Sequence, residues 1–240
     1  YISDAVEAAK KADVAVLFIG LTDEFESEGF DRTHLRIPPE HVALLSAIRG
    51  VTENIVVVLA GGAVVEMPWI GETKALLNSY LGGEASGSAV TDILFGDVNP
   101  SGKLADTIPD SYDSYQNAQE FLTGFEHLDY FDDIYVGYRY FETIPGAAEK
   151  VRYPFGFGLS YTDFEFSGAF CGESDGKIVA AVTVKNIGKV PGKEVVQLYY
   201  SAPQGKLGKP AKELAAFKKT KLLSPGESEA IALSFDIGDM

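Results

Sequence analysis

The stretch VAVLFIGLTDEFESEGFDRTHLRIPPEHVALLSAI, residues 14–48, decides the fold of the first half of the chain. Its first part, Val14–Gly20, is a continuous apolar run, which is typical of a parallel strand buried on both faces. Its last part repeats apolar residues at helical spacing, namely Val42, Leu45 and Ile48. A strand, a loop and a helix in this order are the building unit of an α/β domain.

The loop inside this stretch, residues 22–38, is strongly acidic. Five acids are followed at once by an arginine: Asp23, Glu24, Glu26, Glu28, Asp31 and Arg32. Open α/β sheets bind their ligands at the carboxyl ends of the strands, where such a loop lies. The acidic loop therefore has two interpretations. In the first, one of its carboxylates is catalytic. In the second, the loop is simply a charged surface in contact with water.

The chain on either side of this stretch continues the same alternation. An amphipathic helix opens the chain, two apolar strands are expected at Ile55–Ala60 and Ala75–Leu81, and a helix follows at Glu84–Phe95. We therefore predict an α/β fold, an open and mostly parallel sheet flanked by helices, over residues 1–110. No dinucleotide-binding or P-loop glycine pattern is present, and the pairs Gly61-Gly62 and Gly82-Gly83 are interpreted as turns that allow a close approach of the backbone.

Residues 111–159 are rich in aromatic side chains and poor in regular pattern. These rings are Tyr112, Tyr115, Tyr130, Phe131, Tyr135, Tyr138, Tyr140, Phe141, Tyr153, Phe155 and Phe157. We expect the segment to be a connection that packs on both domains, because an irregular segment needs large side chains to bury enough area. A platform that stacks on sugar rings is the alternative.

From residue 160 to 240 the pattern is all β. Five alternating strands are expected: Phe164–Phe170, Lys177–Asn186, Glu194–Ser201, Lys212–Leu222 and Glu229–Phe235. This spacing predicts an immunoglobulin or fibronectin type III-like sandwich. Since such a sandwich usually has about seven strands, the one predicted here is incomplete.

The composition of the chain makes some partners and some cellular compartments less favourable than others. The formal net charge is −15, from 35 acidic and 20 basic residues, so nucleic acid is an unfavourable partner. No apolar run has the length of a membrane helix, which argues against a membrane partner. Cys171 is the only cysteine and no signal-like leader follows Tyr1, which favours the cytoplasm over secretion. A homo-oligomer is compatible with the sequence.

Several long motifs, taken in order, point to a known family. They are ESEGFDRTHLRIPPEH (Glu26–His41), GGAVVEMPW (Gly61–Trp69), LGGEASGSAVTDILFGDVNPSGKLADTIP (Leu81–Pro109), DDIYVGYRYFE (Asp132–Glu142) and YPFGFGLSYTDF (Tyr153–Phe164). Together they resemble the family-three glycoside hydrolases of the β-glucosidase type. The resemblance covers the α/β sandwich domain and the fibronectin type III-like domain of that family, without its catalytic barrel.

The resemblance implies a role for particular residues of the acidic loop. Glu28, in the motif E-G-F-D-R, would be the general acid/base, with Glu26 as the alternative. Phe30 would contact the substrate on its leaving-group side. Asp31 and Arg32 would support the loop, with Arg32 holding an acid of the loop in a two-pronged pair.

The resemblance also implies what this chain lacks. The aspartate nucleophile of a retaining exo-β-glucosidase lies on the barrel, which would stand before Tyr1 or after Met240, so the chain alone is expected to be inactive. The implied partners are that barrel and β-glucosides such as cello-oligosaccharides or aryl glucosides. A β-xylosidase on the same scaffold and a non-catalytic carbohydrate-binding or scaffolding module are the alternatives. Neither a cofactor nor a metal is expected, because two carboxyl groups suffice for the reaction.

Overall fold

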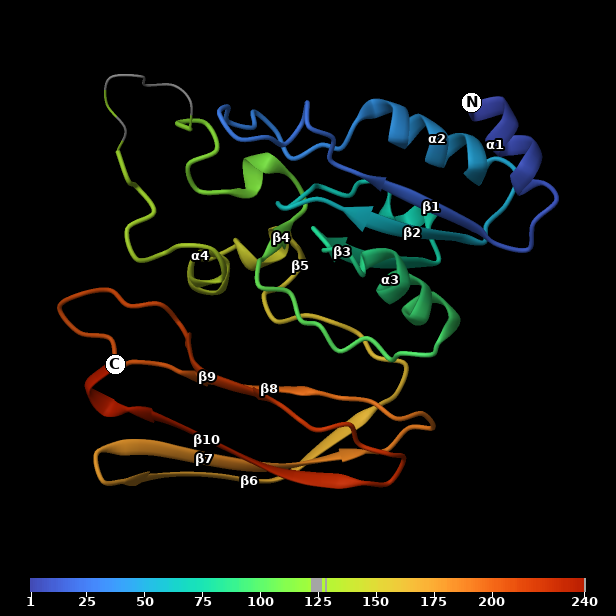
Figure 1. Cartoon of the computed structure of the whole chain (residues 1–240). Helices are drawn as coiled ribbons and strands as arrows, with labels where there is room; N and C mark the ends of the chain where they lie inside the picture. Colours follow the sequence, from blue (N-terminus) through green and yellow to red (C-terminus); the bar gives the residue numbers. More distant parts are fainter. Residues whose placement is uncertain (122–126, 128, 240) are drawn as a thin grey trace. The chain divides into compact units, whose positions relative to one another are not determined.

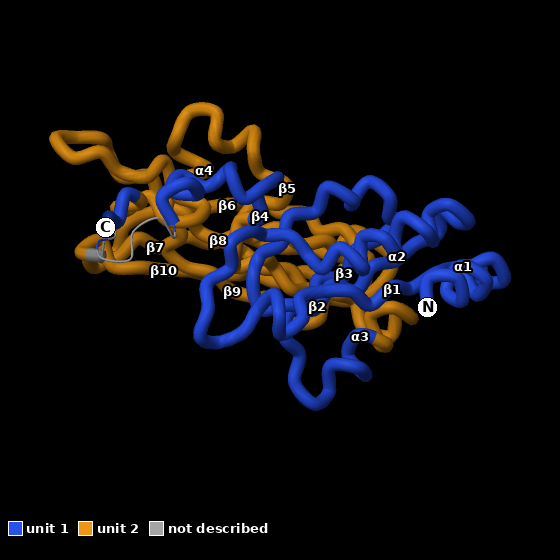
Figure 2. Tube along the Cα trace, turned by 90° about the horizontal axis from the view of Figure 1, so that it is seen from above, with its two compact units in different colours: residues 1–90, 108–131 blue, residues 91–107, 132–240 orange. Residues whose placement is uncertain are grey.

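The computed structural model describes residues 1–121, 127 and 129–239. The chain forms two compact units (Figure 2). The first consists of Tyr1–Val90 and Ile108–Phe131, and the second consists of Thr91–Thr107 and Asp132–Met240. A parallel sheet with helices belongs to the first unit and a β-sandwich to the second, which confirms the predicted fold class.

The first unit is built around three parallel strands in the order β1-β2-β3. Its elements are α1 (Ile2–Ala9), β1 (Ala15–Gly20), α2 (Pro39–Arg49), β2 (Ile55–Ala60), η1 (Ile70–Glu72), β3 (Ala75–Tyr80), β4 (Ile108–Pro109) and η2 (Tyr112–Ser114). Helix α3 (Ser86–Phe95) begins in this unit and ends in the second. Helices α1 and α2 lie together on one face of the sheet (Figure 1), where Leu45 and Ile48 of α2 are buried.

Strand β1 differs from its prediction in burial. Leu17 and Ile19 are buried, but Val16 and Phe18, which alternate with them, are 42% and 66% exposed. The prediction of burial on both faces is therefore wrong for β1 and right for the central strand β2, whose pattern is almost fully buried. The physical reason is position, because β1 lies at the edge of the three-stranded sheet and β2 lies in its middle.

The end of β1 is fixed closely against β2. The two strands pair in register from Ala15 with Ile55 to Gly20 with Ala60, and the N–H of Leu21 still donates to the carbonyl of Ala60 at 2.9 Å. A Cβ atom at Gly20 would collide with the carbonyl oxygen of Ala60, so only glycine allows this approach. The acidic loop therefore starts beside the turn that follows β2.

The second unit consists mainly of antiparallel strands. Its elements are α4 (Tyr138–Thr143), η3 (Ala148–Lys150), β5 (Val151–Tyr153), β6 (Phe164–Ser174), β7 (Lys177–Asn186), β8 (Val195–Tyr200), β9 (Glu213–Lys219), β10 (Ser228–Asp236) and η4 (Ile237–Asp239). The sheets have the orders β10-β7-β6 and β8-β9. Their buried core is formed by Val184, Val196, Leu223 and Ile231.

Part of the aromatic segment packs within this second unit. Tyr138 stacks on Phe155 with ring centroids 4.6 Å apart, and its edge meets Tyr199 of β8 at 6.2 Å. The Tyr138 hydroxyl also accepts a hydrogen bond from the N–H of Leu214 in β9. These rings fasten α4 to the β8-β9 sheet. Residues 122–126 and 128 of the predicted connection lie outside the described residues.

The described residues contain neither a metal-binding cluster nor a long apolar helix. No group of three or more His, Cys, Asp or Glu side chains is arranged to hold a metal ion there. Within the same residues, no helix combines the length and the hydropathy needed to cross a bilayer.

Candidate active site

The acidic loop begins with a tight turn at the carboxyl end of β1. The carbonyl of Thr22 accepts hydrogen bonds from the N–H groups of Phe25 and Glu26, at 2.8 and 2.9 Å. The turn reverses the chain and brings the side chain of Glu26 back towards the sheet. Glu26 is partly buried, whereas Asp23 and Glu24 are exposed.

Glu26 forms the first tie between the loop and the turn after β2. Its Oε2 accepts a hydrogen bond of 2.6 Å from the backbone N–H of Gly62. An N–H donating to a carboxylate is a charge-assisted bond, roughly twice as strong as a neutral one. Sequence reasoning did not predict this tie, because its partners are 36 positions apart and no local pattern links them.

Arg32 forms the second tie. Its Nη1 donates to the carbonyl of Val64 at 3.0 Å, and among the described residues its Nε and Nη2 have no hydrogen-bond partner. The predicted two-pronged pair with an acid of the loop is therefore not formed. Burial lowers the pKa of the Arg32 guanidinium, while the negative charge of Glu26 and the nearby Tyr115 act in the opposite direction.

A third tie follows at Leu35, whose carbonyl accepts from the N–H of Glu66 at 2.9 Å. Together the ties attach the loop at Glu26, Arg32 and Leu35 to the single segment 62–66. This segment includes Gly62, at one of the predicted close-approach turns. A Cβ atom at Gly62 would lie 2.9 Å from Leu81 Cδ1 and 3.2 Å from Glu26 Oε2, so the ends of two side chains crowd this glycine.

Between the first two ties the chain forms an exposed tip, residues 27–31, which carries the predicted acid/base. Glu28 and Asp31 are exposed, and Phe30 is 50% exposed. Gly29 has a φ of 97°, a left-handed conformation that glycine adopts without strain. Glu28 has no hydrogen bond or ion pair with any residue that the structure describes. The tip thus presents a carboxyl group and an aromatic ring, two residues apart, on a support fixed at both ends.

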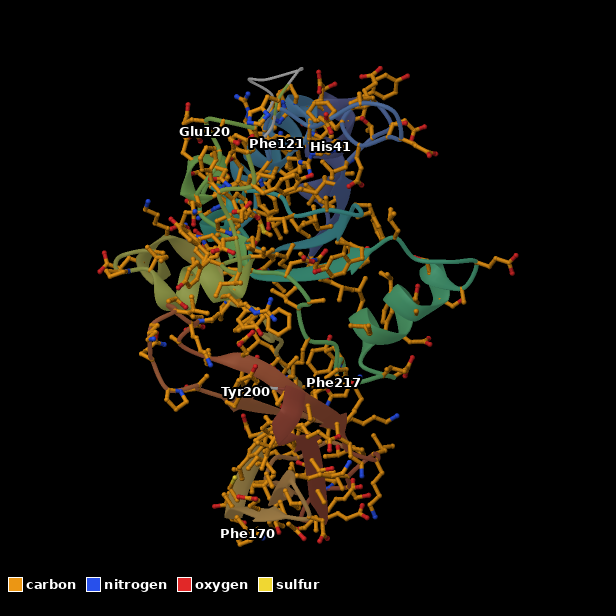
Figure 3. The ribbon with its side chains drawn as sticks, turned by 90° about the vertical axis from the view of Figure 1, so that its left-hand side faces the viewer. His41, Glu120, Phe121, Phe170, Tyr200 and Phe217 are labelled. Carbon is orange, nitrogen blue, oxygen red and sulfur yellow. The ribbon has the colours of Figure 1, made fainter. Side chains whose placement is uncertain are left out.

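One histidine contacts the end of β1, where the loop begins, and another lies within the loop. Nδ1 of His41 in α2 lies 3.1 Å from the carbonyl oxygen of Gly20 and 3.3 Å from its backbone nitrogen (Figure 3). The ring of His34 contacts that of Phe25, with centroids 5.8 Å apart. Both histidines thus make packing or hydrogen-bonding contacts, and neither belongs to a metal cluster within the described part of the chain.

A small cavity lies at the carboxyl ends of β2 and β3. It has a volume of about 10 Å³ and is lined by residues that include Ala60, Gly61, Val64, Asn78 and Tyr80. A water molecule needs roughly 10–15 Å³ of this kind of space, so the cavity cannot admit a sugar ring.

Comparison with known proteins identifies the family. Residues 1–161 match the glycosyl hydrolase family 3 C-terminal domain, and residues 194–240 match the fibronectin type III-like domain. The thermostable β-glucosidase B of Acetivibrio thermocellus is 46% identical over 98% of this chain. An exo-α-(1->6)-L-arabinopyranosidase of Bifidobacterium longum is 40% identical over 98% of it.

Solved structures give the same result. The crystal structure of the β-glucosidase of Kluyveromyces marxianus in complex with glucose matches 99% of this chain, with a TM-score of 0.92 and 41% sequence identity. The chain spans only 31% of the Acetivibrio and Bifidobacterium enzymes and 28% of the Kluyveromyces chain. Since the first match covers well over half of the residues, the chain belongs to glycosyl hydrolase family 3 and carries its C-terminal and fibronectin type III-like domains.

Proposed function

We propose that this chain contributes the general acid/base, Glu28, to a retaining exo-β-glucosidase that removes terminal non-reducing β-D-glucosyl residues. The observation that carries the proposal is the exposed tip. It holds a glutamate at the carboxyl end of the first parallel strand, with no partner among the described residues, and is tied at both ends. The relatives named β-glucosidase support the reaction class.

The chemistry requires a second carboxyl group that this chain does not supply. Retaining hydrolysis uses two carboxyl groups about 5–5.5 Å apart, one attacking the sugar and one serving the leaving oxygen. Glu28 would donate its proton to the leaving oxygen in the first step and accept a proton from water in the second. The aspartate nucleophile would come from a barrel domain, within the two-thirds or so of the relatives that this chain does not span.

The side chains around Glu28 have separate roles in this proposal. Phe30, half exposed beside the acid, would offer an apolar surface to the leaving group of a cello-oligosaccharide or an aryl glucoside. Arg32 holds the far end of the tip through the Val64 carbonyl. Asp31 is exposed and would support the loop only through its backbone.

The test is the Glu28→Ala variant of the complete enzyme. Because general acid catalysis contributes about 10²- to 10⁴-fold, turnover of glucosides with poor leaving groups should fall by that factor. Azide should restore turnover of an activated aryl glucoside and yield a glucosyl azide. Glu24→Ala, at an exposed acid of the same loop, is the matched control and should keep wild-type rates.

The result that contradicts the proposal is equally clear. Unchanged turnover in Glu28→Ala, together with no product of azide attack, would show that another group does the work. Azide rescue in Glu26→Ala instead of Glu28→Ala would transfer the acid/base role to Glu26.

One comparison provides an alternative sugar specificity to be tested. The Bifidobacterium longum relative at 40% identity is named an exo-α-(1->6)-L-arabinopyranosidase, so the same scaffold serves more than one sugar. The ratio of kcat/KM for nitrophenyl β-D-glucoside, β-D-xyloside and α-L-arabinopyranoside decides between these specificities. We expect the glucoside to be preferred, and a higher value for either pentoside would replace the glucosidase assignment.

A further inference from the structure

We propose that Glu26 is a positioning residue for Glu28: its carboxylate, bound to the backbone N–H of Gly62, fixes the near end of the tip that carries the acid/base. This inference rests on the proposed role of Glu28. In this inference Glu26 is not the acid/base itself. Its side chain has a different function, which is to position Glu28.

The first argument is the distribution of contacts along the loop. Glu26 bonds Gly62 at 2.6 Å and Arg32 bonds the Val64 carbonyl at 3.0 Å. The five residues between them, 27–31, are all exposed. The position of Glu28 is thus set by its two flanking ties, and Glu26 is the nearer of the two, only two residues away.

The second argument is the fit of the Glu26 carboxylate to its site. At Gly62 an added Cβ atom would lie 3.2 and 3.3 Å from the two carboxylate oxygens, which is a tight approach. A glycine at this position therefore lets the carboxylate reach the backbone N–H. With one oxygen engaged by an N–H and the side chain partly buried, Glu26 is poorly placed to exchange protons with a substrate.

The third argument is electrostatic. The positive charge of Arg32, partly buried beside the loop, interacts favourably with the negative charge of Glu26. This attraction links the two ends of the tip, so that each tie stabilises the other. A catalytic group must be held closely in place, because a misplacement of about 1 Å can cost about 10²-fold in rate.

The experiment compares two variants of Glu26 in the complete enzyme. Glu26→Ala removes the tie and should lower kcat/KM for a glucoside with a poor leaving group by about 10²-fold. A glucoside with an activated aryl leaving group needs little proton donation, so its kcat/KM should fall much less. Glu26→Gln keeps an oxygen that can accept from Gly62, and should recover most of the loss, to within about tenfold of wild type.

A pair of glycine variants tests the tie without altering any acid. Gly62→Ala places a methyl group about 3.2 Å from the Glu26 carboxylate, and should shift the leaving-group dependence in the same direction as Glu26→Ala but by a smaller factor. Gly83→Ala is the matched control, because a Cβ atom there meets nothing within 4 Å. It should leave both substrates at wild-type rates. If Glu26→Ala does not fold, Glu26→Gln and Gly62→Ala still decide the question.

Each other outcome overturns the inference. Equal losses for both leaving groups would indicate general destabilisation, and equal losses in Glu26→Gln and Glu26→Ala would show that the hydrogen-bond acceptor is not what matters. Azide rescue of Glu26→Ala would make Glu26 the acid/base. The proposed function fails separately, if Glu28→Ala keeps full activity, so the two failures are distinguishable.

Discussion

One buried amide organises a corner of the sandwich at the scale of a single residue. Asn186 at the end of β7 is fully buried, and its Oδ1 accepts from the Thr162 hydroxyl at 2.7 Å and from the Gly188 N–H at 3.0 Å. Its Nδ2 donates to the carbonyls of Val190 and Leu223, each at 2.8 Å. All four bonding positions of the amide are therefore used, as a buried polar group requires.

We predict that Asn186→Ala lowers the free energy of unfolding by about 3–5 kcal/mol, because it leaves several buried groups without partners at about 1–3 kcal/mol each. Denaturant unfolding of the chain measures the change. Asn54→Ala, which removes one exposed hydrogen bond to the Asp13 carbonyl, is the control and should cost less than about 1 kcal/mol. A loss at Asn186 no larger than at Asn54 would contradict this account.

At the scale of elements, the hairpin of β6 and β7 shows how local sequence sets pairing. A two-residue turn joins the strands, and both of its residues have positive φ, 52° at Asp175 and 74° at Gly176. The Asp-Gly pair is a preferred sequence for a type I′ turn, whose twist matches that of the strands. The register from Ser174 with Lys177 onward follows from this turn.

The sheet of β8 and β9 contains a tyrosine whose ionisation is coupled to stability. Tyr200 stacks on Phe235 of β10, and its hydroxyl donates to Glu213 of β9 at 3.0 Å. Burial raises the pKa of Tyr200 above its usual value of 10.0, and the bond to Glu213 acts in the same direction. The folded protein therefore keeps this proton at a pH where the unfolded chain releases it.

The sign of the pH effect follows from this difference. The contribution of Tyr200 to the free energy of unfolding is fully present below pH 10.0. It is lost as the pH rises through the pKa that Tyr200 has in the folded protein. We predict that the melting temperature of the wild type falls as the pH is raised through this range, and that the melting temperature of Tyr200→Phe falls less steeply. Tyr130→Phe, at a side chain that is 86% exposed, is the control. Identical slopes in wild type and Tyr200→Phe would show that this proton is not linked to folding.

The bounds of the strands could be predicted from the sequence far better than the burial and the long-range contacts of their residues. The strands at Ile55–Ala60 and Lys177–Asn186 were predicted with the bounds that the structure has, because long apolar or alternating runs carry their own signal. The exposure of Val16 and Phe18 was missed, since an apolar run does not reveal whether its strand is central or at an edge. The tie from Glu26 to Gly62 was missed as well, because it depends on how β1 and β2 are placed side by side.

At the scale of the whole molecule, one stretch of the chain belongs to a different unit from the one that the sequence pattern predicts. Residues 91–107, which sequence analysis places with the α/β domain, belong to the second compact unit. Asn99 accepts from the Ser160 hydroxyl and the Tyr161 N–H, and Lys103 pairs with Glu194 at 2.8 Å with both side chains mostly buried. The domain limits at 110 and 160 stay predictions.

The prediction for the whole molecule concerns the barrel domain that the proposed function requires. The isolated chain should show no glucosidase activity, and activity should appear when it is mixed with a separately produced family 3 barrel domain. The same mixture with Glu28→Ala should stay inactive towards poor leaving groups. Size-exclusion chromatography shows whether the two pieces associate in each case. Equal activity of both mixtures would favour the alternative of a non-catalytic carbohydrate-binding or scaffolding module.

The tip between Glu26 and Arg32 has a consequence for how such enzymes diversify. Its ends are held by backbone groups of segment 62–66, so their partners do not depend on the side chains within the tip. Residues 27, 30 and 31 can therefore be exchanged during evolution or in the laboratory with little effect on the sheet, whereas Gly29, with its φ of 97°, cannot. Under the role proposed for Glu28, substitutions at these three positions would change the surface offered to the leaving group and leave both ties in place.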